Sequence, residues 1–381
     1  MDFLYFCNLK EIFMAKTISV FLATLLLAAS CTEQVQSGRE TIDYVLSIAG
    51  SPDSPEHSLL AGKSKLTPDG DIYIMGSPES CALLGESFKE CDRFDNVRAR
   101  RTPDGLKDFS GETFSLMCDP EYTPYAEFAN TAGSRSMREL MARMAVASLD
   151  DKCNVSIYDL EGNAPKRPAK MIILSDPWML LDGKFDIDTL FALTSCKVPV
   201  ISPQELLFDA VFGGDKKYFN IGLMCDSLYS GTGVYEELFR QKVAQHGLME
   251  AKYFEAATPQ DTLHRLASFL DAYIESGRTE PLDVLLVDDW SVDQKDLLDE
   301  LALIRDYSKE ESMRYGKTVA PDFTVICSSG LTMGTCYLQL RQSSLFTHRI
   351  ALPELKSYTL RPLPGGSLLQ FLMIPSENVQ N

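Results

Sequence analysis

Eight short apolar runs, separated for the most part by helical patterns, indicate the fold class of this chain. Each run has five or six residues, the length of a strand buried in a parallel sheet. The runs are DIYIM (71–75), TFSLM (113–117), KMIIL (170–174), VPVIS (198–202), FNIGLM (219–224), AKYFEA (251–256), DVLLV (283–287) and FTVIC (323–327). Helical patterns include residues 136–147, 233–245, 259–276 and 294–315. Such alternation predicts an α/β fold with parallel sheets.

Eight strands over about 260 residues suit two domains better than one. We predict two doubly wound, mostly parallel-sheet domains that face each other across a cleft, with a hinge near Gly213-Gly214-Asp215. A further strand-like stretch covers 44–48, and a late strand is expected at 368–374. The predicted segments are a signal peptide (1–30), a tether and N-terminal extension (31–69), a first domain (70–214), a second domain (215–347) and a C-terminal extension (348–381).

The N-terminal region indicates where the protein is located. The apolar run TISVFLATLLLAAS, residues 17–30, is too short for a transmembrane helix and is typical of a signal peptide. Small residues lead into Cys31, and this arrangement resembles the lipobox of bacterial lipoproteins, in which the cysteine is lipidated. Asp2 and Glu11 are unusual for a signal peptide, so Met14 is a better start than Met1. We expect a lipid-anchored protein of the cell envelope; the alternatives are a secreted protein cut near position 30 and a retained membrane anchor.

Composition excludes several classes of partner. Hydrophobic residues make up 45% and charged residues 24%, as in ordinary globular proteins. The net charge of -18 repels phosphate backbones, so we expect no nucleic-acid partner. With 4 His and no HExxH or CxxC motif, no metal site is expected, and no pattern predicts a cofactor. The eight cysteines after Cys31 permit disulfides, although Cys225 and Cys327 lie in apolar strands and are better interpreted as buried thiols.

The ends of the predicted strands hold the candidate binding residues, because ligands of open α/β sheets bind at the carboxyl ends of the strands. The chain's two tryptophans both follow an aspartate at such an end. We predict that these side chains line the cleft: Ser77, Asp176, Trp178, Asp226, Ser227, Thr232, Asp289 and Trp290. Carboxylates beside aromatic faces suit a cationic or hydroxyl-rich ligand. The alternatives are that the aspartates cap helices and that the tryptophans pack helices onto sheets.

One stretch carries a family resemblance. Residues 221–237, IGLMCDSLYSGTGVYEE, resemble the segment that opens the second domain in the aspartate/glutamate/hydantoin racemase superfamily, with Thr232, Gly233 and Tyr235 at the matching positions. Residues 76–79 resemble the loop after that family's first strand. The resemblance covers about residues 70–345 and implies two similar α/β domains that face across a cleft.

The chain departs from the family where the chemistry takes place. The resemblance implies one cysteine at the end of strand three and another at the end of strand seven, and these positions hold Ser175 and Asp288 here. A serine hydroxyl is too weakly acidic to replace a thiolate without an adjacent base. Asp288 could act as a base if desolvation raised the pKa of its carboxyl. Cys118 and Cys225 also end strands and are the remaining catalytic candidates.

From the sequence we therefore expect an envelope lipoprotein that binds a small polar molecule in its cleft and does not racemise amino acids. One alternative is an isomerase or lyase of altered chemistry that uses Asp288. Another is a type I periplasmic binding protein of a transporter, which would need two or three crossings between lobes. The strands here run four and then four, which predicts fewer.

Overall fold

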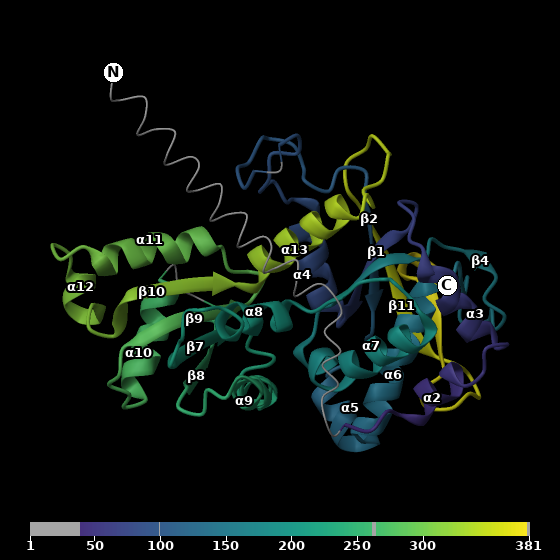
Figure 1. Cartoon of the computed structure of the whole chain (residues 1–381), viewed down its shortest axis with the longest axis horizontal. Coiled ribbons are helices and arrows are strands. Elements are labelled where there is room, and N and C mark those ends of the chain that lie inside the picture. The colour runs from purple at the N-terminus through teal and green to yellow at the C-terminus, as the bar shows by residue number, and fades with distance from the viewer. Residues whose placement is uncertain (1–38, 99, 261–263, 379–381) are drawn as a thin grey trace. The chain divides into compact units, whose positions relative to one another are not determined.

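Two parallel sheets contain nearly all the strands (Figure 1). The computed structural model describes residues 39–98, 100–260 and 264–378. The first sheet has the order β12-β11-β2-β1-β5-β6 and the second the order β10-β9-β7-β8. Within these two sheets, as far as the structure describes them, only β12 runs antiparallel to its neighbour, so the predicted α/β class is confirmed. The strands of the first sheet are β1 (Asp71–Gly76), β2 (Thr113–Cys118), β5 (Ala169–Leu174), β6 (Val200–Ile201), β11 (Glu354–Pro362) and β12 (Phe371–Pro375). Those of the second are β7 (Asn220–Cys225), β8 (Lys252–Ala257), β9 (Leu282–Asp288) and β10 (Val319–Cys327), and a separate small ladder joins β3 (Lys152–Cys153) to β4 (Ala164–Pro165).

Helices cover both faces of each sheet, which explains the continuous apolar runs. Tyr73 and Met75 of β1 face one core cluster, and Ile72 and Ile74 face the other, because successive side chains of a strand point to opposite faces. One face of the first sheet packs against α2 (Asp43–Ala49), α3 (Pro55–Ala61), α5 (Tyr125–Ala132), α6 (Ser134–Leu149) and α7 (Lys184–Thr194), and the other against α4 (Pro78–Lys89) and α13 (Ser328–Gln342). The second sheet packs against α10 (Arg265–Glu275), α11 (Gln294–Arg305) and α12 (Glu310–Tyr315) on one face, and against α8 (Pro203–Phe212) and α9 (Val234–His246) on the other. We call each sheet with its covering helices the first and the second lobe.

The two lobes repeat one strand order. In the first lobe the order is β2-β1-β5-β6, and in the second it is β8-β7-β9-β10, so the third strand lies beside the first in both. Met75 pairs with Leu174 in the first lobe, and Met224 pairs with Val287 in the second. Ser175 and Asp288 each follow by one residue and therefore occupy equivalent positions at the carboxyl ends of equivalent strands.

Two segments expected outside the domains belong to the first lobe. The stretch 44–48 is part of helix α2 and not a strand, because Ile42, Val45 and Ile48 recur at helical spacing and are buried. Near the other end, β11 pairs in parallel with β2, from Glu354 opposite Thr113 to Thr359 opposite Cys118, and β12 extends the sheet. Residues 354–375 therefore complete the first sheet and are not an appendage.

The chain crosses between the lobes twice. It leaves the first sheet after β6 and returns after β10 to form β11. Helix α8 follows a strand of the first sheet but packs against the second, whereas α13 follows a strand of the second sheet and packs against the first. The expectation of fewer crossings was wrong. The number of crossings therefore does not separate this fold from that of a type I binding protein.

Of the features that bear on export, the structure describes the helices and the cysteines after Cys31 but not the signal segment. Residues 17–30 and Cys31 lie outside the described residues. Among the described residues, every helix is too short or too polar to serve as a membrane span. The eight cysteines from Cys81 to Cys336 are free and buried in the described structure, so the permitted disulfides are not formed there.

Candidate functional site

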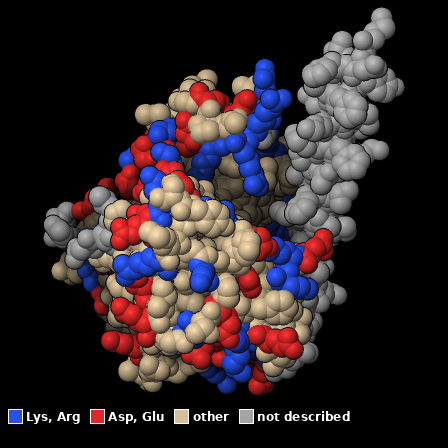
Figure 2. All heavy atoms as spheres, turned by 90° about the vertical axis from the view of Figure 1, so that its left-hand side faces the viewer, with Lys and Arg blue, Asp and Glu red and all other residues tan. Residues whose placement is uncertain are grey.

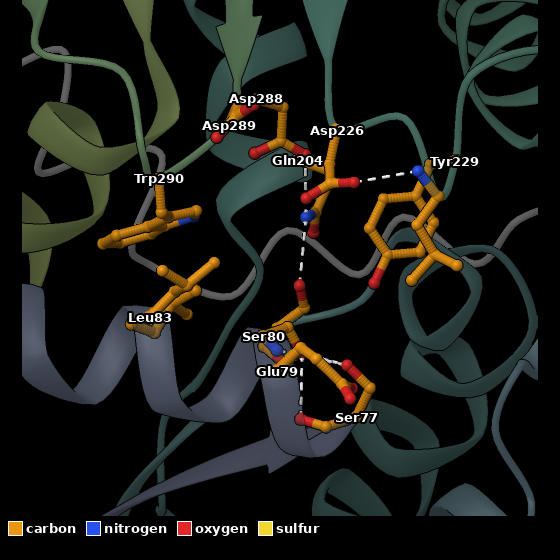
Figure 3. A pocket seen from close by; sticks show the side chains of 13 residues that line it. Ser77, Glu79, Ser80, Leu83, Gln204, Asp226, Tyr229, Asp288, Asp289 and Trp290 are labelled. Carbon is orange, nitrogen blue, oxygen red and sulfur yellow. Dashed lines mark hydrogen bonds between the residues drawn. The ribbon is translucent and has the colours of Figure 1, made fainter. Parts of the chain in front are cut away.

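A small pocket lies between the carboxyl ends of the two sheets (Figure 3). Its volume is about 40 Å³, enough for about three water molecules. Both lobes contribute to its walls, as the predicted cleft requires. The lining residues are Ser77, Glu79, Ser80, Leu83, Leu84, Ser175, Gln204, Asp226, Leu228, Tyr229, Asp288, Asp289 and Trp290.

Three serine hydroxyls form the wall of the first lobe. Ser77 begins α4, and its Oγ accepts a hydrogen bond from the backbone N–H of Ser80 at 3.1 Å. Ser175 Oγ donates to Met75 O at 2.8 Å and lies 2.8 Å from Ser80 Oγ. Only glycine is compatible with position 76, because a Cβ there would lie 2.0 Å from Ser175 Oγ. The hydroxyls are therefore positioned by the loop after β1 and by one another.

Asp288, at the end of β9, is the central group of the opposite wall. It is 5% exposed, and its Oδ2 accepts hydrogen bonds from Tyr235 Oη at 2.5 Å and from Gln204 Nε2 at 2.9 Å. Burial raises the pKa of its carboxyl, and the nearby Ser328 hydroxyl opposes that rise. Neither Ser328 Oγ nor Asp288 Oδ1 has a hydrogen-bond partner in the described structure. Figure 3 shows the carboxyl group pointing into the pocket between Gln204 and Trp290.

Two further aspartates of the pocket, Asp289 and Asp226, begin tight turns. Asp289 is 5% exposed, and its Oδ1 accepts from the backbone N–H of Ser291 at 2.8 Å, whereas its Oδ2 has no partner. Asp226 is half-buried and accepts from the backbone N–H of Leu228 at 2.8 Å. In each case the side chain accepts from the N–H two residues on, so these aspartates close turns after the strands and do not cap helices as the alternative interpretation has it.

Asp176 joins the two lobes and does not line the pocket. Its Oδ2 accepts a hydrogen bond from Tyr229 Oη of the second lobe at 2.8 Å, and its Oδ1 accepts from the backbone N–H of Trp178 at 2.8 Å. Burial raises the pKa of Asp176 to about 7. A buried aspartate of one lobe is thus bonded to a tyrosine in the pocket wall of the other.

The two tryptophans lie at the junction of the lobes, but only Trp290 lines the pocket. The ring of Trp290, which follows β9, is stacked on Phe88 of the first lobe with centroids 6.0 Å apart. Trp178 packs against core clusters of both lobes. The expectation that Trp178 lines the cleft does not fit this placement, because the side chain is partly buried against both cores and is not among the lining residues.

The structure brings together only part of the predicted set. Ser77, Ser175, Asp226, Asp288, Asp289 and Trp290 line the pocket. Ser227 and Thr232 are exposed and stay outside it, since Ser227 Oγ donates to Asp226 Oδ1 at 3.4 Å and Thr232 Oγ1 to Tyr229 O at 2.7 Å.

The catalytic cysteine candidates also lie away from the pocket walls. Cys118 Sγ lies 3.5 Å from Ser357 Oγ, and a hydrogen bond from Cys81 lowers the pKa of Cys118. Cys225 is fully buried, and burial raises the pKa of its thiol. In the described structure no thiol lines the pocket.

Several lining residues were not predicted. Ser80 and Leu83 follow Ser77 at helical spacing, so a helix that begins at the strand end could have indicated them. Tyr229 lies three residues beyond the strand-end Asp226. Gln204 had no such signal, because its position depends on how α8 crosses between the lobes.

The charge of the pocket is uncompensated. Its lining includes four acidic residues and no Lys, Arg or His. Elsewhere the signs mix, and Figure 2 shows Asp and Glu interspersed with Lys and Arg over the face carrying the second lobe. Among the residues that the structure describes, no group of three or more His, Cys, Asp or Glu is placed to hold a metal ion. The pocket therefore combines acidic oxygens with an aromatic wall.

Comparisons with known proteins concern the fold alone. No protein-family model matches the chain, and no curated protein matches it. Among solved structures, a glutamate racemase from Bacillus anthracis is 14% identical with a TM-score of 0.43, covering 76% of this chain and 88% of that one. A glutamate racemase from Francisella tularensis in complex with D-glutamate is 12% identical with a TM-score of 0.44, covering 79% and 90%. An aspartate racemase homologue from Pyrococcus horikoshii is 12% identical with a TM-score of 0.37, covering 72% and 99%. These proteins are of the superfamily that the sequence resembles.

Proposed function

We propose that the protein binds a small polar molecule in the pocket between its lobes and does not racemise amino acids. The observation that supports this most is the pair of equivalent strand ends, which present Ser175 and Asp288 where the sequence resemblance implies two thiols. A polar, partly enclosed pocket between two lobes is an ordinary place for a small ligand.

The chemistry of these two groups argues against a two-base mechanism. Ser175 Oγ is hydrogen-bonded to Met75 O and lies beside Ser80, and the lining has no His or Lys to act as its base. Asp288 supplies one acid–base group only. Each such group contributes about 10²–10⁴-fold, so the absence of both thiols raises the barrier by roughly 5–11 kcal/mol.

Proton exchange at Cα tests the absence of racemisation. The protein is incubated in heavy water with aspartate, glutamate or a hydantoin, and loss of the Cα proton is followed by NMR. We expect no exchange above that of a heat-denatured control. Exchange that is well above this control and is abolished by Asp288→Asn would overturn the proposal.

Ligand binding itself is tested by thermal shift against a library of small polar metabolites. We expect at least one compound to raise Tm in wild type and to change the fluorescence of a Trp178→Phe variant, whose remaining tryptophan, Trp290, lines the pocket. The absence of any such compound would contradict the proposed binding function.

A second candidate function is an isomerase or lyase of altered chemistry. It is favoured by the carboxyl of Asp288, which combines burial, a raised pKa and one unpartnered oxygen in a pocket, as catalytic acids and bases often do. The exchange experiment separates the two functions, because an active Asp288 would label one proton position of its substrate and a binding protein would label none.

We also propose that the protein is a lipoprotein of the cell envelope, held to the membrane through Cys31 alone. The short apolar run and the small residues before this cysteine support the proposal. Metabolic labelling with an alkyne fatty acid should label wild type and leave Cys31→Ala unlabelled. Equal labelling of both would refute the assignment of the site.

A further inference from the structure

Two cysteines outside the ligand pocket meet beneath the surface of the first lobe. Cys81 is on α4, Cys118 ends β2, and both side chains belong to the core cluster between that helix and the sheet. Cys81 Sγ donates to Ile74 O at 3.4 Å, and Met117 O lies 3.7 Å from the same sulfur. Since Met117 directly precedes Cys118, these contacts place the sulfur of Cys81 beside the end of β2.

The two thiols also contact each other. The Cys81 thiol is a hydrogen-bond donor to the sulfur of Cys118. Alternate side chains of a strand share one face, and Leu116 and Cys118 of β2 both face the cluster that contains Cys81. The sulfurs are therefore already neighbours, so a bond between them requires a local adjustment of α4 and not a rearrangement of the lobe.

The two thiols differ in exposure and in acidity. Cys81 has no exposed surface, and burial raises the pKa of its thiol well above the ordinary value. Cys118 is 8% exposed, and its sulfur lies 3.5 Å from the hydroxyl of Ser357, an exposed residue of β11. The hydrogen bonds from Cys81 and Ser357 lower the pKa of Cys118, although burial opposes them. The thiolate is the reactive form of cysteine, so Cys118 is suited to attack and Cys81 to react second.

We propose that Cys81 and Cys118 form a redox-active dithiol that exchanges with small disulfides. The Cys118 thiolate attacks one sulfur of the small disulfide, whose S–S bond breaks, and the other sulfur leaves and takes up the proton that Cys118 lost. The Cys81 thiol then loses its proton and attacks Cys118 Sγ, which releases the second half of the small molecule as a thiol. Two protein thiols are thereby oxidised to one disulfide, and the small disulfide gains two electrons and two protons and becomes two thiols.

This dithiol is separate from the ligand pocket but adjoins one of its walls. Figure 3 shows Ser77, Ser80 and Leu83 of α4 at the pocket, and Cys81 follows Ser80 directly. A bridge from Cys81 to Cys118 would tie the beginning of α4 to β2. The inference goes beyond the proposed binding function and does not depend on it.

Peptide mapping tests the pair directly. The reduced full-length protein is incubated with bis(2-hydroxyethyl) disulfide, the remaining thiols are blocked with N-ethylmaleimide, and the protein is digested with trypsin without reduction. Tryptic peptides 66–89 and 108–135 each contain one cysteine, Cys81 and Cys118 respectively. We expect mass spectrometry to find these two peptides joined by a disulfide and to find them separate again after treatment with dithiothreitol. Absence of the joined peptides from the folded, treated protein would overturn the inference.

Single variants assign the order of the two steps. Cys81→Ser keeps a hydrogen-bond donor beside Cys118 but removes the second thiol, so a mercaptoethanol adduct should accumulate on Cys118. Cys118→Ser should leave Cys81 unmodified. Cys336 is a fully buried thiol of the same cluster, and burial raises its pKa, so in wild type it should react at least about tenfold more slowly than Cys118. The matched control Cys336→Ser should leave the yield of joined peptides unchanged.

A further pair of variants tests the hydrogen bond between the thiols. Cys81→Ala lacks the donor, so the adduct on Cys118 should form several times more slowly than in Cys81→Ser. Equal rates in these two variants would refute the role of Cys81 as donor. Circular dichroism confirms that each variant is folded, and the wild-type mapping stays decisive if one of them is not.

The remaining outcomes keep this inference distinct from the proposed function. Joined peptides that form only in urea would show that the pairing belongs to the unfolded chain and would overturn the dithiol. Equal modification of Cys118 and Cys336 would overturn it as well, because the reaction would then not depend on this site. Neither result would affect the ligand pocket, since its lining includes neither Cys81 nor Cys118.

Discussion

The two lobes have the same strand order but different chemistry at the equivalent strand end. In the first lobe Ser175 ends the third strand, and its hydroxyl is held by Met75 O and Ser80. In the second lobe Asp288 occupies that position, with one oxygen bonded to Tyr235 and Gln204 and the other unpartnered. The fold therefore places a hydroxyl of one lobe and a carboxyl of the other across one pocket. At this pair of positions the first lobe supplies a neutral group and the second an acidic one.

A second contrast concerns how each lobe treats buried charge. The first lobe buries an ion pair between Lys170 Nζ and Glu112 Oε2 at 2.7 Å, with side chains 2% and 1% exposed. Lys170 Nζ also donates to Pro68 O at 3.0 Å and to Leu345 O at 2.8 Å. The second lobe buries Asp288 and Asp289 with no Lys or Arg in the pocket lining. The buried carboxyl of Glu112 is thus held by a cation, whereas that of Asp288 is held by the hydrogen bonds of Tyr235 and Gln204 alone.

The largest expected effect follows from breaking the ion pair of the first lobe. Lys170→Met leaves Glu112 buried and unpaired and should lower the free energy of unfolding by about 3–5 kcal/mol. Urea unfolding followed by circular dichroism measures the change. The double variant Lys170→Met/Glu112→Gln should recover most of the loss, and a failure to recover would mean that packing, not charge, sets the cost.

The next effect concerns the pH dependence of stability. The pKa of Asp176 is raised by burial from 3.8 to about 7, so the folded state binds more protons than the unfolded state between these values. Stability should therefore fall as pH rises from about 4 to about 7 and level off above, by on the order of 4 kcal/mol at most for this group. Asp176→Asn should remove this part of the slope in urea unfolding at a series of pH values. An unchanged slope would show that Asp176 titrates normally.

A smaller effect is expected from the hydrogen bond that joins the lobes. Tyr229→Phe removes the donor to Asp176 Oδ2 and leaves that buried oxygen unsatisfied, which should cost about 1–3 kcal/mol of stability. Since Asp176 would then lose a bond that favours its charged form, its pKa should rise further in the variant. Urea unfolding at pH 5 and pH 8 measures the loss of stability and its dependence on pH. A loss that is equal at the two pH values would contradict the expected rise in the pKa of Asp176.

The smallest effect compares two helix caps, one inside the pocket and one outside it. Ser77 caps α4 and Ser54 caps α3, each accepting from a backbone N–H three residues on. Alanine at either position should cost about 1 kcal/mol of stability. Of the two, only Ser77 lines the pocket, so Ser77→Ala should also alter the response of Trp290 to ligand, and Ser54→Ala should not. Equal ligand responses would remove Ser77 from the site.

The sequence predicts strands correctly where burial on both faces produces a continuous run of apolar residues. The apolar runs of β1, β5 and β9 lie between helices on both faces and were found almost to the residue. β11 was missed because its sequence, ELKSYTLRP, alternates polar and apolar side chains and keeps much of its surface exposed. Helix α2 was mistaken for a strand because a seven-residue helix shows only two turns of its period.

The site was predictable to the extent that it lies at strand ends. Ser175, Asp288 and Trp290 were found because parallel strands bring their carboxyl ends to one edge. Gln204 could not be found, since its contact with Asp288 depends on α8 leaving one lobe to cover the other. Trp178 does not line the pocket because the motif that it shares with Trp290 is shifted by one residue relative to the strand end, and the partly buried side chain packs against both cores instead.

The return of the chain to the first sheet has a consequence for its biosynthesis. β2 forms its edge partner only with β11, about 240 residues later in the chain. At about 5–20 residues per second, a nascent chain carries that open strand edge for roughly 10 to 50 seconds. An unpaired edge is a template for pairing with other chains. Ribosomes stalled before residue 354 should therefore yield insoluble product, which centrifugation of stalled complexes can measure, and a nascent chain that is sheltered until its C-terminal strands emerge should escape this fate.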